Sequence, residues 1–175
     1  NSLYTMIIKS LNILFNKLGY KLLKDNEKEE YAEFYDLYLQ CKPYTMTSIE
    51  RMYALYKGVE YVVKNNIPGD FVECGVWKGG SSMLIALTLM KFGVNDRKIW
   101  MYDTFEGMSE PGEEDKDNQG TQAKELLTKA SKDVSESVWC FSELDAVKKN
   151  LLNTRYPIDQ IQFIKGKVED TIPIS

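Results

Sequence analysis

Residues 69–82 read Gly-Asp-Phe-Val-Glu-Cys-Gly-Val-Trp-Lys-Gly-Gly-Ser-Ser, and this stretch decides the fold. Its first half predicts a short apolar strand over Phe71–Cys74, with a proline and a glycine before it and a glycine after it. A helix is expected to follow at once, because Ser81 and Ser82 are favoured N-terminal capping residues and residues 83–90 are largely apolar. The intervening glycines let a ligand lie against the backbone, where free helix N–H groups point outward. The stretch therefore predicts a strand, a loop and a helix that together bind an adenosine-containing ligand.

A second strand that ends in an acidic residue follows at the distance that a βαβ unit requires. Residues 98–103 read Lys-Ile-Trp-Met-Tyr-Asp, and Asp103 lies roughly 20 residues after the last glycine of the first stretch. At that spacing an acidic side chain meets ribose hydroxyls in doubly wound folds. A carboxylate suits a ribose diol because it accepts two hydrogen bonds, and charge-assisted hydrogen bonds are the stronger kind. With a third apolar strand expected at 161–164, these signals predict an α/β fold with a parallel sheet.

Three classes of nucleotide-binding motif compete for the glycine-rich stretch, and the residues separate them. A phosphate-binding P-loop has a lysine after its last glycine, whereas this chain has Ser81, so ATP hydrolysis is disfavoured. A dinucleotide fingerprint needs a glycine where this chain has Trp77, so NAD is disfavoured too. What remains is an acidic residue, Glu73, that can pair with the ammonium group of a sulfonium ligand. S-adenosylmethionine meets that requirement.

Three segments carry a resemblance to a known family: residues 69–81, 100–108 and 166–173. In order and spacing they resemble the macrocin O-methyltransferase family, and the similarity runs from about Pro43 to the end of the chain. The resemblance implies a Rossmann-like fold and an enzyme that transfers a methyl group from S-adenosyl-L-methionine. It also implies that the acceptor is a sugar hydroxyl of a natural product or a glycan, and that the reaction depends on magnesium, as is usual in the family.

The same resemblance assigns cofactor-binding roles to residues of this chain. The residues that would line the methionine part of the cofactor are Glu73, Gly75, Gly79 and Ser81. Asp103 would hold the ribose, and Glu169, after the third strand, would lie near the adenine. The loop at 43–47 is expected to fold over the cofactor as a lid, which makes Thr45 and Met46 further candidates.

The acceptor side of the site is less complete in this sequence. Glu143 is a candidate substrate contact, together with Trp139 and Phe141, although ordinary packing explains these side chains equally well. In the family, the aspartates that bind magnesium and the strands of the acceptor half lie after a Val-Glu-Asp-Thr-Ile-Pro motif, whereas this chain ends at Ser175. The catalytic base and the metal ligands are therefore expected downstream, with no metal site within this chain. Within this chain a histidine base is excluded, because the chain contains no histidine.

Length and composition fit one domain or part of one. The expected division is an N-terminal helical region at 1–66 and the cofactor-binding half of a methyltransferase domain at 67–175, truncated at its C-terminus. Helices are expected at 27–40, 48–65, 123–130 and 143–153. The chain begins with Asn1 rather than methionine, which indicates trimming at this end as well.

Charge and cysteine content narrow the partners and the compartment. With 22 basic and 26 acidic residues, the net charge of -4 gives no sign of a nucleic-acid partner. The three cysteines are scattered, which predicts a reducing, cytoplasmic compartment, and Cys74 is expected as a small buried strand residue. The acidic loop at 106–117 is more typical of a solvated surface than of a cation site. The basic amphipathic segment at 3–23 is too polar to span a membrane, and packing against the domain or a dimer mate is favoured over a membrane surface.

The strand pattern has a consequence for assembly. The three expected strands form only the 3-2-1 half of a Rossmann-like sheet, and the first strand, which is normally central, is left as an apolar edge. An open edge presents unpaired backbone groups and invites pairing with another chain. The sequence therefore predicts a homo-oligomer.

These observations together predict an S-adenosylmethionine-dependent O-methyltransferase that acts on a sugar. Two alternatives stay open: a truncated or degenerate module that binds S-adenosyl compounds without catalysis, and a glycan or nucleotide-sugar binding protein that uses the aromatic-rich helices. Binding of S-adenosyl compounds but not of NAD separates the first two functions from the third. Methyl transfer separates the enzyme from the binding module.

Overall fold

The computed structural model describes residues 25–131 and 137–172, together with Ile7 and Leu11. The amphipathic segment expected at 3–23 lies outside the described residues, apart from those two side chains, which are exposed. Within the described part of the chain, no helix is both long enough and apolar enough to cross a membrane.

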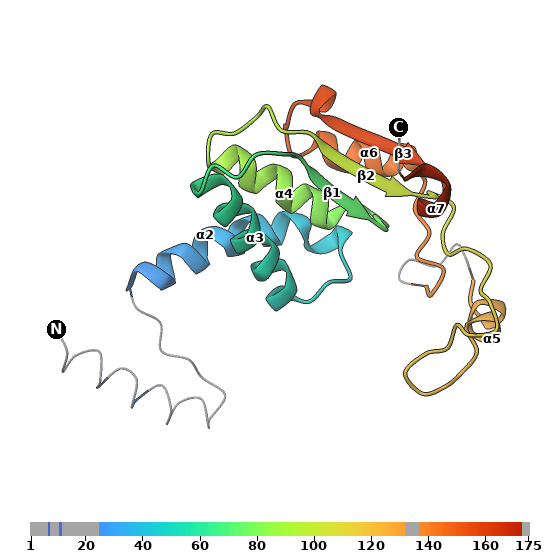
Figure 1. The fold of residues 1–175 in the computed structure, drawn as a ribbon. Coiled ribbons are helices and arrows are strands. Elements are labelled where there is room, and N and C mark those ends of the chain that lie inside the picture. The colour runs from blue at the N-terminus through green and yellow to red at the C-terminus, as the bar shows by residue number, and fades with distance from the viewer. Residues whose placement is uncertain (1–6, 8–10, 12–24, 132–136, 173–175) are drawn as a thin grey trace. The chain divides into compact units, whose positions relative to one another are not determined.

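The chain separates into two compact units, Asn1–Asp36 and Leu37–Ser175. Helix α2 spans Asp25–Cys41 and therefore runs through the boundary between them. In the first unit, the ring of Tyr31 lies 5.7 Å from the ring of Phe34, and Phe34 is fully buried. The second unit contains the sheet and all the residues to which the sequence assigns a function (Figure 1).

Three parallel strands form the sheet, in the order β1-β2-β3. Strand β1 spans Phe71–Cys74, β2 spans Ile99–Asp103 and β3 spans Ile161–Lys165. The register aligns the first residues of all three strands, so their carboxyl ends meet at one edge of the sheet (Figure 1). The order and direction are those that the sequence predicts for half of a Rossmann-like sheet.

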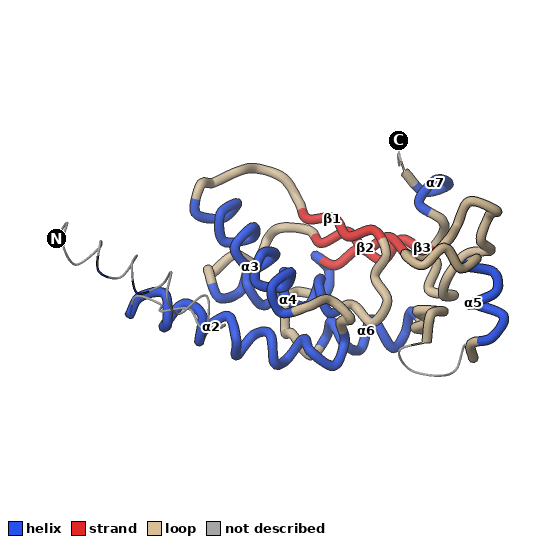
Figure 2. Tube along the Cα trace, turned by 90° about the horizontal axis from the view of Figure 1, so that it is seen from below, coloured by secondary structure: helices blue, strands red, loops and turns tan. Residues whose placement is uncertain are grey.

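Three helices lie on one side of this sheet: α3 (Ile49–Lys64), α4 (Gly80–Lys91) and α6 (Leu144–Leu152) (Figure 2). Helix α4 is the centre of the layer, because it packs against β1, β2, α3 and α6. Leu84 and Leu89 are fully buried, as expected for a helix that is apolar around most of its circumference. Helix α3, which is expected in an N-terminal helical region at 1–66, packs on α4 in the structure.

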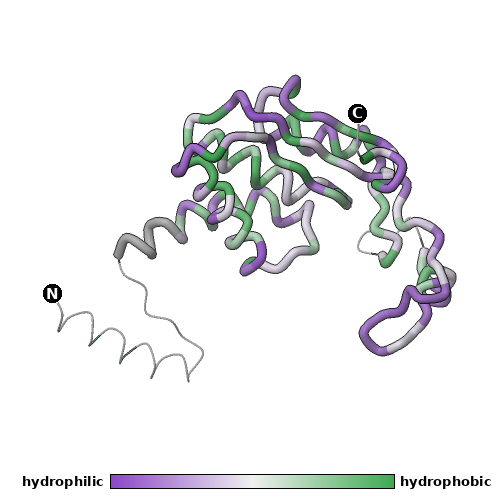
Figure 3. The backbone as a smooth tube through the Cα atoms, in the orientation of Figure 1, coloured by the Kyte–Doolittle hydropathy of each residue, from purple (hydrophilic) through white to green (hydrophobic). Residues whose placement is uncertain are grey.

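The shorter elements are η1 (Lys42–Tyr44), α5 (Ala123–Lys129), η2 (Ile158–Gln160) and α7 (Val168–Thr171). The bounds of the four expected helices agree with the observed ones to within two residues at each end. Between β2 and α6 the chain leaves the sheet and returns, and the tip of this excursion, before α5, is strongly hydrophilic (Figure 3).

The start of α4 differs from the expectation. The residue that caps the helix is Gly79, with φ 88°, while Ser81 and Ser82 lie inside the first turn. The prediction that these serines cap the helix is wrong, because the chain needs a left-handed residue to turn from the loop into the helix, and glycine adopts that conformation without strain. The hydroxyl of Ser82 donates a hydrogen bond to Glu73 instead.

Among the described helices, only the short α7 contacts the sheet from outside the α3, α4 and α6 layer, at the carboxyl ends of the strands (Figure 2). Successive strand residues point to opposite sides, and Glu73 points toward α4, so Val72 and Cys74 point away from the helices. Val72 is 59% exposed, and Cys74 is exposed as well, so the prediction of a buried Cys74 is wrong. Within the described residues β1 pairs with β2 alone, which makes it the open edge that the strand pattern predicts.

Candidate functional site

The loop between β1 and α4 is shaped by its glycines. Gly75 has φ 83°, and an added Cβ there would meet nothing within 4 Å, so this stretch of backbone is open. An added Cβ at Gly79 would lie 2.8 Å from Leu151 Cδ2 of α6. At Gly80 it would lie 2.6 Å from the backbone oxygen of Tyr44. The first glycine therefore leaves space beside the loop, whereas the other two let the loop fit tightly between α6 and the segment at 43–47.

The carboxylate of Glu73 lies between the end of β1 and the first turn of α4. It accepts a hydrogen bond from Ser82 Oγ at 2.5 Å. Burial raises the pKa of Glu73 above its usual range, hydrogen bonds from Ser82 and Ser81 oppose that effect, and the nearby charge of Asp103 adds to it. The groups that act most on this pKa are thus hydroxyls, a backbone amide and a second carboxylate. A buried carboxylate in such surroundings gains most from a ligand that brings a positive charge.

The carboxylate of Asp103 lies between the loops that follow β1 and β2. Its Oδ2 accepts hydrogen bonds from the backbone amides of Val76 at 2.6 Å and Trp77 at 3.3 Å. Its Oδ1 accepts a hydrogen bond from the backbone amide of Phe105 at 2.6 Å. On the opposite side of the glycine loop, Asn150 Nδ2 of α6 donates to the backbone oxygen of Lys78 at 3.0 Å. The loop is therefore held from both sides.

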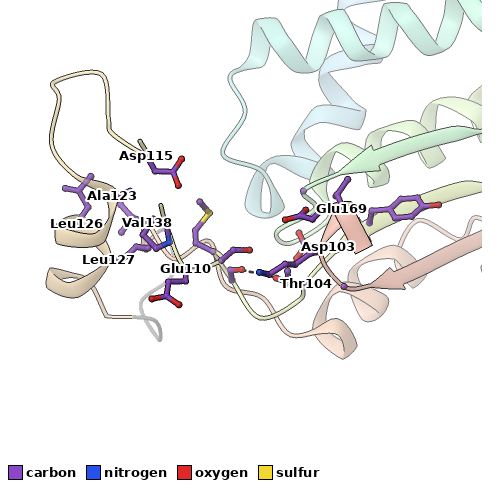
Figure 4. Close-up of a pocket in the computed structure, with 18 of the residues that line it drawn as sticks. Asp103, Thr104, Glu110, Asp115, Ala123, Leu126, Leu127, Val138 and Glu169 are labelled. Carbon is purple, nitrogen blue, oxygen red and sulfur yellow. Dashed lines mark hydrogen bonds between the residues drawn. The ribbon is translucent and has the colours of Figure 1, made fainter. Parts of the chain in front are cut away.

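A cleft of about 590 Å³ opens at the carboxyl edge of the sheet (Figure 4). Asp103, Thr104 and Glu169 line it from the strand ends. Leu126 and Leu127 of α5, with other apolar side chains of the excursion, line the side that faces the strand ends. A volume of this size falls in the range of small-molecule sites, and the lining combines apolar side chains with several charged ones.

The structure brings several of the sequence-predicted residues to this edge of the sheet. Those that line the cleft are Gly75, Asp103 and Glu169. Those that meet around the start of α4 are Glu73, Gly79, Ser81 and Thr45. Thr45 lies close to this turn, because a Cβ added at Gly80 would be 2.7 Å from the Cβ of Thr45. Met46, next to Thr45, is 53% exposed. Glu143 is exposed at the N-terminus of α6 and does not line the cleft.

The apolar wall of the cleft was missed from the sequence. Residues 123–130 carry a helix signal, but nothing in their pattern indicates that Leu126 and Leu127 face the ends of distant strands. Trp139, a candidate for the acceptor site, donates hydrogen bonds from Nε1 to the backbone oxygens of Leu127 and Ala130. It therefore holds the C-terminal end of α5 in place.

The acidic loop contributes Glu110, Asp115 and Asp117 to the rim of the cleft. Asp117 Oδ1 accepts hydrogen bonds from the backbone amides of Gln119 and Thr121, so its charge is used to shape the loop. Among the described residues, no three acidic, cysteine or histidine side chains converge so that they could hold a metal ion.

Comparison with known proteins identifies the family. The family model for macrocin-O-methyltransferase (TylF) matches residues 14–175. The chain belongs to this family. It is 35% identical over 130 residues to the demethyldecarbamoylnovobiocin O-methyltransferase of Streptomyces niveus. It is 31% identical over 132 residues to the mycinamicin III 3''-O-methyltransferase of Micromonospora griseorubida.

The similarity covers most of this chain but only part of its relatives. Each of these two alignments covers 74% of this chain, against 46% of the Streptomyces protein and 48% of the Micromonospora protein. The chain thus spans about half the length of the curated relatives it matches. The solved structure of the O-methyltransferase NovP matches with a TM-score of 0.61 and 31% identity, over 75% of this chain and 51% of NovP. This match confirms the predicted fold class, a partial Rossmann-like methyltransferase fold.

Proposed function

We propose that this protein binds S-adenosyl-L-methionine and takes part in transferring its methyl group to a sugar hydroxyl of a natural product or a glycan. One observation carries the proposal: the partly buried Glu73 carboxylate lies at the start of a glycine loop that leads from the sheet edge into α4. Membership of the family supports it, because the matched relatives are named as O-methyltransferases of novobiocin, tetracenomycin and mycinamicin compounds.

The described residues fit the cofactor. The open backbone at Gly75 leaves room for a ligand, and the partly buried carboxylate of Glu73 suits its ammonium group. The proposed contacts to the methionine part are Glu73, Gly75, Gly79 and Ser81, with Thr45 and Met46 in the loop above them. Asp103 is proposed to face the ribose, and Glu169 to lie beside the adenine, since both line the cleft.

When bound, S-adenosyl-L-methionine supplies an electrophilic methyl group on a positively charged sulfur. The residues of this chain would fix the direction in which that group points. The ionised form of Glu73 attracts the ammonium group, and the glycine loop, held by Asp103 and Asn150, gives the ligand a rigid backbone to lie on. The apolar wall at Leu126 and Leu127 would keep water away from the opposite side of the ligand.

The proton of the acceptor hydroxyl must pass to a base, or its acidity must be raised by a metal. Magnesium, which the family resemblance implies, finds no fitting set of ligands among the described residues. No step is therefore assigned to it. We propose that the base and the metal ligands belong to the part of the relatives that this chain does not span.

The proposal includes a compartment and an assembly. Cys41, Cys74 and Cys140 are all free thiols, which supports a reducing cytoplasm. The open edge of β1, with the exposed side chain of Val72, supports a homo-oligomer. The proposed acceptor is a small molecule or glycan that carries a sugar.

Binding and methyl transfer test the proposal in two stages. S-adenosylhomocysteine is expected to bind to the purified protein in a calorimetric titration, and NAD is not. Transfer of a labelled methyl group from S-adenosylmethionine to a desmethyl sugar of an antibiotic then tests the reaction itself. Binding without transfer would support a non-catalytic module, and binding of sugar ligands alone would overturn the proposal.

A further inference from the structure

Two bulky residues beside the candidate cofactor site have left-handed backbone conformations. Trp77, in the loop after β1, has φ 50°, and Phe105, in the loop after β2, has φ 52°. Side chains with a Cβ are strained in this region, and residues other than glycine, asparagine and aspartate rarely adopt it. Backbone strain of this kind persists only where the surrounding structure holds it in place.

The same carboxylate binds the backbone amides of both strained residues. Asp103 Oδ2 accepts hydrogen bonds from Val76 and Trp77, and Oδ1 accepts one from Phe105. The backbone oxygen of Asp103 also accepts a hydrogen bond from the amide of Gly166, at 3.0 Å, where β3 ends. One residue thus joins the loops that follow all three strands.

The hydrogen bonds to Asp103 limit what it can offer to a ligand. A carboxylate has about four acceptor positions. Three of these are occupied by backbone amides, which leaves about one for a ribose hydroxyl while the loops keep this conformation. A bidentate grip on a ribose diol, which the strand-end position of Asp103 suggests, requires more free positions than that.

We propose that Asp103 is a positioning residue, which holds Trp77 and Phe105 in their left-handed conformations and so fixes the two loops against which the S-adenosyl ligand lies. The inference rests on the proposed function, because the ligand is the one proposed there. Contact with the ribose is then a minor part of what Asp103 contributes to affinity. The larger part is transmitted through the backbone of the glycine loop.

A ligand that lacks the ribose diol distinguishes a positioning role of Asp103 from direct contact with the ribose. S-adenosylhomocysteine and its 2',3'-dideoxy analogue are titrated into the wild type and the Asp103→Ala variant. A positioning role predicts that the variant weakens both ligands by about tenfold or more, and by the same factor within about threefold. If the variant weakens only the ligand with the diol, Asp103 acts on the ribose alone and the inference is overturned. If S-adenosylhomocysteine does not bind to the wild type, the proposed function fails instead.

Relief of the strain gives a second readout. Trp77→Gly removes the left-handed penalty at one of the two residues, so Asp103→Ala/Trp77→Gly is expected to regain at least about threefold in affinity for both ligands. The control is Trp77→Gly alone, which measures what loss of the indole itself does to binding, so that the effect of Asp103→Ala is compared in the two backgrounds. If Asp103→Ala does not fold, recovery of the fold in the double variant supports the inference. Absence of any recovery, in affinity or in folding, contradicts it.

Discussion

The carboxylates of Glu73 and Asp103 lie near the carboxyl ends of neighbouring strands but are bonded in different ways. Asp103 accepts three hydrogen bonds from backbone amides of two loops. Glu73 accepts hydrogen bonds from Ser81 and Ser82, and burial changes its pKa more than any of these hydrogen bonds does. A partly buried carboxylate that has no cationic partner among the described residues has the most to gain from a cationic ligand. At the scale of single residues, Glu73 is therefore the group that attracts the ligand, and Asp103 is the group that fixes the loops against which the ligand lies.

The raised pKa of Glu73 predicts a pH dependence of stability. Below about pH 4.5, the ordinary value, this group is protonated in both the folded and the unfolded state. As the pH rises further, the unfolded state loses its proton first, so the free energy of unfolding falls by up to about 1.4 kcal/mol per pH unit until the pKa in the fold is passed. Urea unfolding of the ligand-free protein between pH 4.5 and 8 measures this decrease. Glu73→Gln should lack this component, and identical pH profiles for variant and wild type would refute the prediction.

The same group predicts that a cationic ligand displaces a proton. An ammonium group beside Glu73 favours the ionised carboxylate, so binding of S-adenosylhomocysteine lowers the pKa and releases up to one proton. Titrations in buffers of different ionisation enthalpy measure that number. Release should disappear in Glu73→Gln. A wild type that binds the ligand without proton release at any pH between 4.5 and 7 would show that Glu73 is already ionised.

At the scale of elements, the glycine loop is held by two elements, β2 and α6. Asp103 of β2 holds its first half, Asn150 of α6 binds the backbone oxygen of Lys78, and Gly79 packs against Leu151. The conformation of the loop thus depends on elements far from it in the sequence. A rigid support of this kind reduces the entropy that a ligand loses when it binds.

Substitutions at two glycines distinguish the effect of packing against α6 from the effect of left-handed backbone strain. Gly79 has φ 88°, and a Cβ there would lie 2.8 Å from Leu151 Cδ2, whereas Gly93 has φ 72° and a Cβ there would meet nothing within 4 Å. Gly93→Ala is expected to lower the free energy of unfolding by about 1–2 kcal/mol, the left-handed penalty alone. Gly79→Ala is expected to lower it by about 2–4 kcal/mol and to weaken S-adenosylhomocysteine binding as well. Urea unfolding measures both, and equal losses would mean that α6 does not press on the loop.

The sequence predicts the elements well because their signals are local. Strand β1 has the bounds that its apolar run indicates, and Asp103 is placed correctly at the end of β2. The three hydrogen bonds to Asp103 were not predictable, because they depend on the left-handed conformations of Trp77 and Phe105, which no residue preference indicates. The burial of Cys74 was mispredicted because the pattern of a strand does not say which of its two sides is covered.

At the scale of the molecule, the described part of the sheet has one side covered by helices and two edge strands, β1 and β3. The chain spans about half the length of its curated relatives, so the sheet corresponds to part of theirs. Among the described residues, the backbone groups on the free side of β1 have no strand partner, and Val72 beside them is exposed, so we expect a second copy to pair there.

Self-association through this edge is testable. Light scattering after size-exclusion chromatography is expected to show a dimer at concentrations of tens of micromolar. Val72→Lys should raise the dissociation constant by about tenfold or more, because an antiparallel pair of β1 edges brings the two introduced ammonium groups close together. Tyr61→Lys, at an exposed position on α3, is the matched control and should leave the dimer unchanged. A wild type that is a monodisperse monomer would contradict the expectation.

The most direct test of the central claim is a calorimetric titration of S-adenosylhomocysteine into the wild type and the Glu73→Gln variant. Glu113→Gln, in the exposed acidic loop, removes the same charge elsewhere and serves as the control. The account predicts that the wild type and the control bind alike, and that Glu73→Gln binds about thirtyfold more weakly or worse, the loss expected when a buried charge pair loses one partner. Equal binding by all three proteins, or no binding to a wild type that circular dichroism finds folded, would contradict the claim that this carboxylate and its glycine loop form an S-adenosyl site.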